Sequence, residues 1–194
     1  MQTTQNKKFH NQSHREVRTQ PSLFCYAIFY SSFIIPYIFR FENFPIKLKE
    51  GKILSMNRRE YVLVEFPPSQ TYSYIRQGIQ QLQFAGYEVI LAHVERYHCI
   101  AEDVELAEEL YDMGVNLQVN ADSITGGSGR KIRKFIEELM NRDLVFCVGT
   151  DAHDTKHRPP KMKKAAAHVE KRYGEDYTRR IFYSNAKSML KKRD

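Results

Sequence analysis

Cysteine is scarce in this 194-residue chain, and its three copies lie far apart at Cys25, Cys99 and Cys147. Their odd number and wide spacing exclude a disulfide framework and the paired cysteines of a structural zinc site. A reducing, cytoplasmic setting is the simplest interpretation of this cysteine usage.

A nucleic-acid-binding motif is also lacking, although the formal net charge is +7. A basic balance is compatible with nucleic acid, an anionic membrane surface or a phosphorylated substrate. The excess of Lys and Arg is concentrated after residue 156, among helix-forming residues without interleaved aromatic side chains. This pattern favours a solvated basic face, and we predict no nucleic-acid partner.

The chain is too short for a complete (β/α)₈ barrel, which typically needs about 250 residues. It is long enough for one domain with its own core. Hydrophobic residues make up 42% and charged residues 27%, which is typical of a globular protein rather than a disordered one.

The first 46 residues differ in composition from the rest of the chain. Residues 1–22 are polar, and residues 23–39 form an uncharged apolar stretch that Arg40 follows. This stretch resembles a signal anchor, but it is at the lower limit of length for a spanning helix, and Pro36 weakens it further. The segment shows neither helical nor strand periodicity, so a displaced reading frame and a buried strand or helix pair remain alternatives to a membrane anchor. We therefore divide the chain into an atypical segment, 1–46, and a domain, 47–194.

Within the domain, β-rich runs alternate with helical patterns. Strands are predicted at 61–66, 89–94, 116–121 and 145–150, and helices at 71–85, 102–113, 129–142 and 159–173, with two shorter helices after them. Several of the predicted helices are closed by a glycine, as at Gly86 and Gly114. Four strands that alternate with helices predict βαβ units and an α/β fold built on a parallel sheet or barrel.

Side chains that can bind metal follow three of these strands. Glu65 lies at the end of the first strand, His93 at the end of the second, and Asp151 and His153 directly after the fourth. In α/β folds the active site forms at this edge, because the βα loops open there. Carboxylates and imidazoles suit hard or borderline divalent cations. Any one of these residues alone is more simply explained as a structural residue, but together they predict a metal site.

Two arginines lie close to these residues in the sequence. Arg96 comes three residues after His93, and Arg158 comes five residues after His153. A guanidinium group binds phosphate through two parallel hydrogen bonds. A plain surface arginine is the alternative at either position.

Five stretches of the sequence resemble, in order, the PHP-superfamily protein-tyrosine phosphatases of bacterial capsule and exopolysaccharide operons, the CpsB/YwqE type. They are EGKILSMNRREYVLVEFP, VILAHVERY, NLQVNADSITGGSGRKIRKF, LVFCVGTDAHDTKHRPP and YSNAKSML. The resemblance covers roughly residues 47–192. The combination of AH-x-ER with DAH…RPP at this spacing is its most specific part.

The resemblance implies a distorted (β/α)₇ barrel with manganese or another divalent metal at the carboxyl edge. A metal-bound hydroxide would then attack phosphotyrosine on the tail of a bacterial tyrosine kinase. By position in these motifs, the four metal-capable residues named above correspond to the ligands, and the two arginines to the phosphate-binding residues. No cysteine nucleophile is implied, which agrees with the lack of a C-x₅-R loop after Cys99 or Cys147.

The resemblance is incomplete at its beginning. The family starts with a strand carrying an H-x-H pair and an acidic stretch, and a further Glu ligand precedes the region matched here. None of these is present, and we do not assign His10 and His14 as substitutes. We therefore expect a partial barrel without its first βα units, an incomplete metal site, and phosphate binding that is better preserved than turnover.

Two other functions remain open at this point. One is another PHP phosphoesterase, such as a histidinol-phosphate phosphatase, although the RPP after DAH and the ERY after AH favour the tyrosine phosphatases. The other is a non-catalytic remnant or binding module, with residues 23–39 as a membrane tether. Metal content would distinguish this last alternative from the enzymes.

Overall fold

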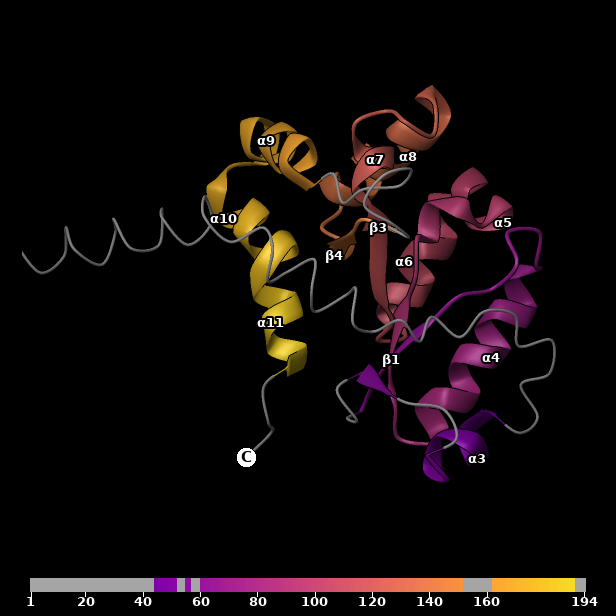
Figure 1. Ribbon diagram of the computed structural model, residues 1–194. Coiled ribbons are helices and arrows are strands. Elements are labelled where there is room, and N and C mark those ends of the chain that lie inside the picture. Colours follow the sequence, from indigo (N-terminus) through magenta and orange to yellow (C-terminus); the bar gives the residue numbers. More distant parts are fainter. Residues whose placement is uncertain (1–43, 52–54, 57–59, 152–161, 191–194) are drawn as a thin grey trace, which may run out of the picture.

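A parallel β-sheet forms the centre of the protein (Figure 1). The computed structural model describes residues 44–51, 55–56, 60–151 and 162–190. The strands are β1 (Tyr61–Val64), β2 (Glu88–Leu91), β3 (Asn116–Asn120) and β4 (Val145–Gly149), and they lie in the order β1-β2-β3-β4. Each described strand pairs in parallel with the strand that follows it in the sequence. The predicted α/β fold with a parallel sheet is therefore confirmed.

Helices make every connection between these strands. Helix α4 (Tyr72–Phe84) joins β1 to β2; η3 (Val94–Arg96), α5 (His98–Glu102) and α6 (Val104–Asp112) join β2 to β3; α7 (Ala121–Ile124) and α8 (Arg130–Asn141) join β3 to β4. The remaining elements are α3 (Phe44–Lys49), α9 (Met162–Tyr173), α10 (Glu175–Arg179), the π-helical turn η4 (Arg180–Ser184) and α11 (Asn185–Leu190). In Figure 1, α9, α10 and α11 lie on the opposite side of the molecule from α4.

Local sequence signals set the ends of the longer helices. The hydroxyl of Thr71 accepts a hydrogen bond from the backbone N–H of Tyr74 and caps α4. The carboxylate of Asp103 accepts from the N–H of Glu105 at 3.1 Å and caps α6. Gly114 then turns the chain with φ +80°, a conformation that side chains other than glycine adopt at a cost.

The core fills the space between the sheet and the helices around it. The strands are almost continuously buried, as expected when helices cover a parallel sheet. Apolar side chains of α4 and η4, such as Ile75, Ile79 and Ile181, are completely buried with them. Each such side chain contributes roughly 1.5–3 kcal/mol when it is buried.

The segment after β2 differs from its prediction. The second strand was expected to run through Val94, but β2 ends at Leu91 and a 3₁₀ turn begins at Val94. His93 has φ +35° and ψ +58°, a left-handed conformation that cannot continue a strand. The helix expected at 102–113 corresponds to α6, which begins two residues later because Asp103 is extended and caps it. The short helix α5 before it was not predicted.

Several predictions fall outside the described residues. They include His153, Arg158 and the apolar stretch at 23–39. The boundary proposed between residues 46 and 47 falls within α3. No helix in the described ranges is both long and apolar enough to cross a membrane.

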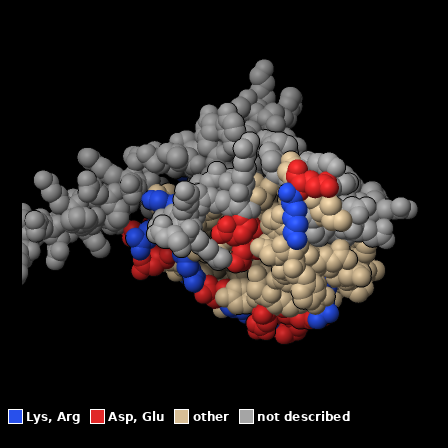
Figure 2. All heavy atoms as spheres, turned by 90° about the horizontal axis from the view of Figure 1, so that it is seen from below, with Lys and Arg blue, Asp and Glu red and all other residues tan. Residues whose placement is uncertain are grey.

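Charged residues of both signs are interspersed on the described surface. In the view of Figure 2, Lys and Arg lie next to Asp and Glu rather than in one continuous basic patch. Ion pairs account for part of this pattern: Arg172 lies 2.9 Å from Glu137, and Arg180 contacts Asp143. Arg172 and Arg180 therefore each have an acidic neighbour.

Candidate phosphate and metal site

The carboxyl edge of the sheet brings four of the predicted site residues together. Glu65 directly follows β1, His93 follows β2 and Asp151 follows β4. The Nε2 atom of His93 lies 3.0 Å from Oε1 of Glu65. Arg96, in η3, is paired with the carboxylate of Asp151. The side chain of Asp151 is 8% exposed and that of Arg96 37% exposed, so this pair bridges the interior and the surface.

His93 is held in an unusual environment. It is 2% exposed, and neither Nδ1 nor Nε2 has a hydrogen-bond partner among the described residues. Its contact with Glu65 is therefore close but lacks the geometry of a hydrogen bond. A buried imidazole nitrogen that lacks a hydrogen-bond partner lowers the stability of the folded state. An electron-pair donor beside a carboxylate oxygen is the combination that binds divalent cations.

Gln118, on β3, holds the backbone of His93 in place. Its Oε1 accepts a hydrogen bond from the N–H of His93 at 2.7 Å, and its Nε2 donates to the carbonyl of Val119 and to Oδ1 of Asn120. A Cβ atom on Gly149 would lie 2.5 Å from Nε2 of Gln118, so the glycine leaves room for this side chain. Sequence reasoning missed Gln118; the only signal was a polar residue between the apolar Leu117 and Val119.

Glu95 is a second residue that sequence reasoning did not assign. Its Oε1 accepts from the N–H of Asn120 at 3.0 Å, whereas its Oε2 has no hydrogen-bond partner among the described residues. The side chain is almost completely buried. Burial raises the pKa of Glu95, and the backbone N–H donors and the nearby hydroxyl of Ser123 only partly oppose this shift. Its place in the AH-x-ER motif was the signal that could have identified it.

Tyr97 connects the turn after β2 to the end of β1. Its hydroxyl accepts a hydrogen bond from the N–H of Phe66 at 3.1 Å, which fixes the backbone next to Glu65. The ring is fully buried, and its centroid lies 6.0 Å from that of His93. Burial raises the pKa of the Tyr97 hydroxyl. Tyr97 thus positions both members of the His93–Glu65 pair.

The described residues fit part of a metal site. Within the part of the chain that the structure describes, no three His, Cys, Asp or Glu side chains are close enough to hold a metal ion. The His93–Glu65 pair has the mixed nitrogen and oxygen donors that zinc and manganese accept. Two of the three described non-glycine residues with positive φ are His93 and Asp151, and strained backbone of this kind clusters at functional sites.

A parallel α/β sheet with buried histidine, carboxylates and arginine at its carboxyl edge defines a class of protein whose ligands bind at that edge. The chain belongs to the family described as capsular polysaccharide synthesis, CpsB/CapC, whose model matches residues 35–191. The resemblance inferred from the sequence motifs is therefore confirmed.

Curated relatives support this assignment. The chain is 29% identical over 149 residues to the tyrosine-protein phosphatase CpsB of Streptococcus pneumoniae, which covers 74% of this chain and 61% of that relative. It is 32% identical over 129 residues to the tyrosine-protein phosphatase YwqE of Bacillus subtilis (strain 168), which covers 66% of this chain and 51% of that relative. The chain thus spans about half to three fifths of the length of these relatives.

A solved structure is similar as well. It comes from crystal structures of YwqE from Bacillus subtilis and CpsB from Streptococcus pneumoniae, which are described as metal-dependent tyrosine phosphatases. The TM-score is 0.65 at 30% sequence identity, and the match covers 70% of this chain and 55% of the other. The arrangement of the sheet and its helices is therefore shared with these proteins.

Proposed function

We propose that residues 47–194 form a domain of a metal-dependent protein-tyrosine phosphatase that acts on a phosphotyrosine-bearing tail of a bacterial tyrosine kinase in the cytoplasm, and so regulates capsule or exopolysaccharide synthesis. The observation that carries this proposal is the joint position of the Glu65–His93 and Arg96–Asp151 pairs at one edge of the sheet. The names of the relatives supply the substrate class.

The fold proposed for this domain is part of a (β/α)₇ barrel. The strand order supports it, because every described strand lies beside its predecessor in the sequence and all are parallel. Sequential order of this kind is typical of barrels, whereas doubly wound sheets reverse their order at a switch point.

Glu65, His93, Asp151 and His153 are the proposed ligands of manganese or another divalent metal. A bound ion of this kind supplies a water of lowered pKa and offsets the charge of the phosphoryl oxygens. Gln118 would keep the imidazole of His93 turned toward Glu65 by fixing its backbone. The first two ligands then face the same point of the edge.

Arg96 and Arg158 are the proposed phosphate-binding residues. The carboxylate of Asp151 contacts Arg96 and restricts the directions in which its guanidinium group can point. A guanidinium group that is held in this way loses less conformational entropy when it forms two hydrogen bonds to a phosphate. Arg96 therefore orients the phosphoryl group, and the edge of the sheet determines where the phosphorus atom lies.

The proposal is tested by binding and turnover of the purified chain with and without Mn²⁺. Phenyl phosphate and a phosphotyrosine peptide serve as ligands in a titration, and p-nitrophenyl phosphate serves as the substrate. We expect metal-dependent binding that Arg96→Ala weakens by about 100-fold, because contacts to a charged group are lost. Arg96→Lys keeps the charge but not the forked geometry, and should restore only part of the affinity.

Arg76→Ala is the matched control, because Arg76 lies on α4 and pairs with Glu109 at 3.1 Å rather than with a residue of the proposed site. Its affinity for phenyl phosphate should equal that of the unchanged chain. Turnover is expected to be lower than in longer relatives, with binding better preserved. Equal losses from Arg76→Ala and Arg96→Ala would contradict the proposal, and so would binding that does not depend on metal.

A further inference from the structure

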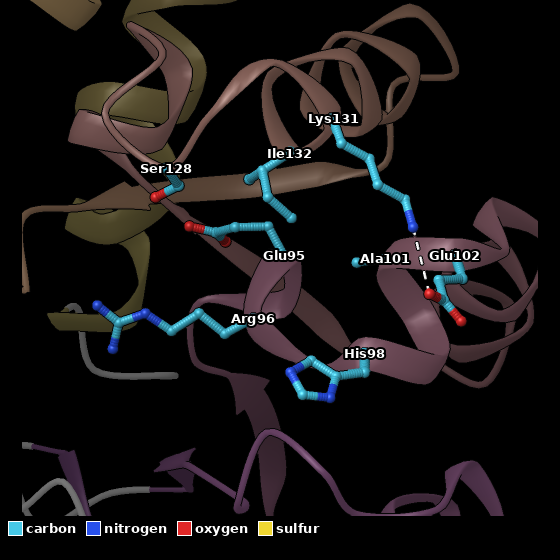
Figure 3. Close-up of a pocket in the computed structure, with 8 residues that line it drawn as sticks. All are labelled: Glu95, Arg96, His98, Ala101, Glu102, Ser128, Lys131 and Ile132. Carbon is cyan, nitrogen blue, oxygen red and sulfur yellow. Dashed lines mark hydrogen bonds and ion pairs between the residues drawn. The ribbon is translucent and has the colours of Figure 1, made fainter.

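The 3₁₀ turn η3 presents Arg96 beside open space. Arg96 lines a cavity of about 240 Å³ whose other walls come from α5, from α8 and from Ser128 ahead of α8 (Figure 3). A long, partly exposed side chain next to a cavity has several directions available to it. Asp151 contacts only the guanidinium group, so the direction in which Arg96 leaves the backbone depends on how η3 is held.

Tertiary contacts must hold η3 in place, because the turn is too short to do so itself. It contains three residues, and His93, at its N-cap, makes no side-chain capping bond. Gln118 holds the beginning of the turn through the N–H of His93, and Tyr97 holds the residue that follows it. Glu95 provides a contact between these two points, directly before Arg96.

Glu95 joins the middle of η3 to the end of β3. Its Oε1 accepts a hydrogen bond at 3.0 Å from the N–H of Asn120, which is the N-cap residue of α7. The hydroxyl of Ser123, in α7, lies near the same carboxylate and is 2.8 Å from the hydroxyl of Ser128. The Glu95 side chain is 1% exposed, so water does not compete for this contact. Glu95 therefore fastens η3 to the junction of β3 and α7.

Glu95 and Arg96 are successive residues of this turn. A 3₁₀ helix has 3.0 residues per turn, so successive side chains point in directions roughly 120° apart. An anchor on one of them therefore sets the direction of the other. Figure 3 shows the side chain of Glu95 pointing toward Ser128, whereas that of Arg96 points away from it.

We propose that Glu95 is a positioning residue for phosphate binding, which holds η3 so that Arg96 points at the phosphoryl group. The proposal rests on the proposed function, in which Arg96 binds the phosphate. Gln118 holds His93, a proposed metal ligand, and Glu95 holds the arginine, so two buried side chains divide the positioning between them. Loss of the Glu95 contact should weaken phosphate binding and leave Mn²⁺ binding unchanged.

Two conservative variants separate the hydrogen bond of Glu95 from its charge. Glu95→Gln keeps an acceptor for the Asn120 N–H but removes the charge, whereas Glu95→Asp keeps the charge but moves the carboxylate away by one methylene group. Affinity for phenyl phosphate is measured by calorimetric titration of the full chain with Mn²⁺. We expect Glu95→Gln to stay within about 2-fold of the unchanged chain and Glu95→Asp to bind about 10-fold more weakly, because a misplaced guanidinium group loses its paired contacts. Mn²⁺ affinity, measured by electron paramagnetic resonance, should be the same in all three proteins.

The Arg96→Ala background shows whether Glu95 acts through Arg96. Glu95→Asp should cause no further loss of phosphate affinity there, because the group that it positions is absent. An equal loss in both backgrounds would overturn the proposal, since Glu95 would then act on the edge as a whole. Equal affinities of Glu95→Gln and Glu95→Asp would also overturn it.

Thr178→Val is the matched control, because Thr178 is buried and its hydroxyl donates to the carbonyl of Gly174 at 2.8 Å, apart from the proposed site. It should lower the stability without changing phosphate affinity. Ser123→Ala provides a milder variant if Glu95→Asp does not fold, with a loss of about 2-fold that again requires Arg96. Phosphate affinity that neither variant changes, but Arg96→Ala lowers, would overturn the positioning role alone. Phosphate affinity that even Arg96→Ala leaves unchanged would overturn the proposed function as well.

Discussion

Two charged regions of this protein are organised in opposite ways. At the carboxyl edge of the sheet, His93 and Glu95 are buried and have polar atoms without hydrogen-bond partners among the described residues. His93 has a left-handed backbone conformation, and Glu95 lies in the 3₁₀ turn after it. On the surface between α6 and α8, Arg142 pairs with Glu105, Glu108 and Glu138, and its neighbours lie in regular helices. The second region satisfies its charges internally, whereas the first contains buried polar atoms that lack such partners.

The comparison shows that a charge cluster alone does not indicate a site. The Arg142 cluster contains more charged groups than the His93–Glu65 pair, yet its ion pairs are formed by partly exposed side chains. Burial without compensation is the distinguishing property of the edge, because such an arrangement persists only when the surrounding fold enforces it. Substitutions should therefore change stability strongly at the edge and weakly in the Arg142 cluster.

The largest effect is expected from Gly149→Ala. The added methyl group would lie 2.5 Å from Nε2 and 3.0 Å from Cδ of Gln118. Displacement of Gln118 would break its bonds to the N–H of His93 and to Asn120, which should lower the free energy of unfolding by about 3 kcal/mol. Urea unfolding measures this change.

A double-mutant cycle provides the control for this prediction. Gln118→Ala removes the side chain that the new methyl group meets, so Gly149→Ala should cost much less in that background. Equal costs in both backgrounds would mean that Gly149 does not act through Gln118.

A smaller effect is expected from Tyr97→Phe. The change removes the hydroxyl that accepts from the Phe66 N–H, and loss of this buried hydrogen bond should lower the free energy of unfolding by about 1 kcal/mol. Thermal or urea unfolding should show the loss, and metal-dependent phosphate binding should weaken with it, since Glu65 is adjacent. The comparison variant is Tyr87→Phe, at a half-buried tyrosine before β2. If both variants lost the same stability, the hydroxyl of Tyr97 would have no special role.

The buried thiol of Cys147, in β4, should make the free energy of unfolding depend on pH. Burial raises the pKa of its thiol to about 12. The unfolded thiol loses its proton near its ordinary pKa of about 8.5, whereas the folded thiol keeps it, so this contribution to stability is present below that value and is lost as the pH rises toward 12. At pH 10 the loss should be about 2 kcal/mol relative to pH 7.

Cys147→Ala isolates this contribution from the other groups that titrate at high pH. Its free energy of unfolding should fall less steeply than that of the unchanged chain between pH 8 and pH 10. Parallel pH profiles for the two proteins would show that the thiol ionises equally in the folded and unfolded states.

The smallest effect is expected from Arg142→Ala. Ion pairs between partly exposed side chains contribute little because water screens them, so we expect the Tm to fall by at most about 2 °C. High salt should reduce even this difference, and phosphate binding should not change. A decrease as large as that of Gly149→Ala would remove the contrast between the two regions.

The alternation of strands and helices could be predicted because it depends on short-range signals. Apolar runs and the glycines after the helices were visible in the sequence. The cap at Asp103 was not predicted. The placement of Glu65, His93 and Asp151 at one edge followed from that alternation, since parallel strands all end on the same side. The end of the second strand was predicted wrongly, because the turn at His93 depends on a hydrogen bond from β3.

The sequence by itself determined the order of the elements, the edge at which polar side chains gather, and the family. Only the tertiary structure decided that Gln118 holds the backbone of His93, that Tyr97 holds the backbone after Glu65, and that one oxygen of Glu95 stays without a partner. The contacts of Gln118 and Tyr97 join residues 25 or more positions apart in the sequence, and they depend on how the neighbouring strands are aligned. A local pattern reports which face a side chain occupies, whereas its hydrogen-bond partners are set by the strands and turns that pack beside it.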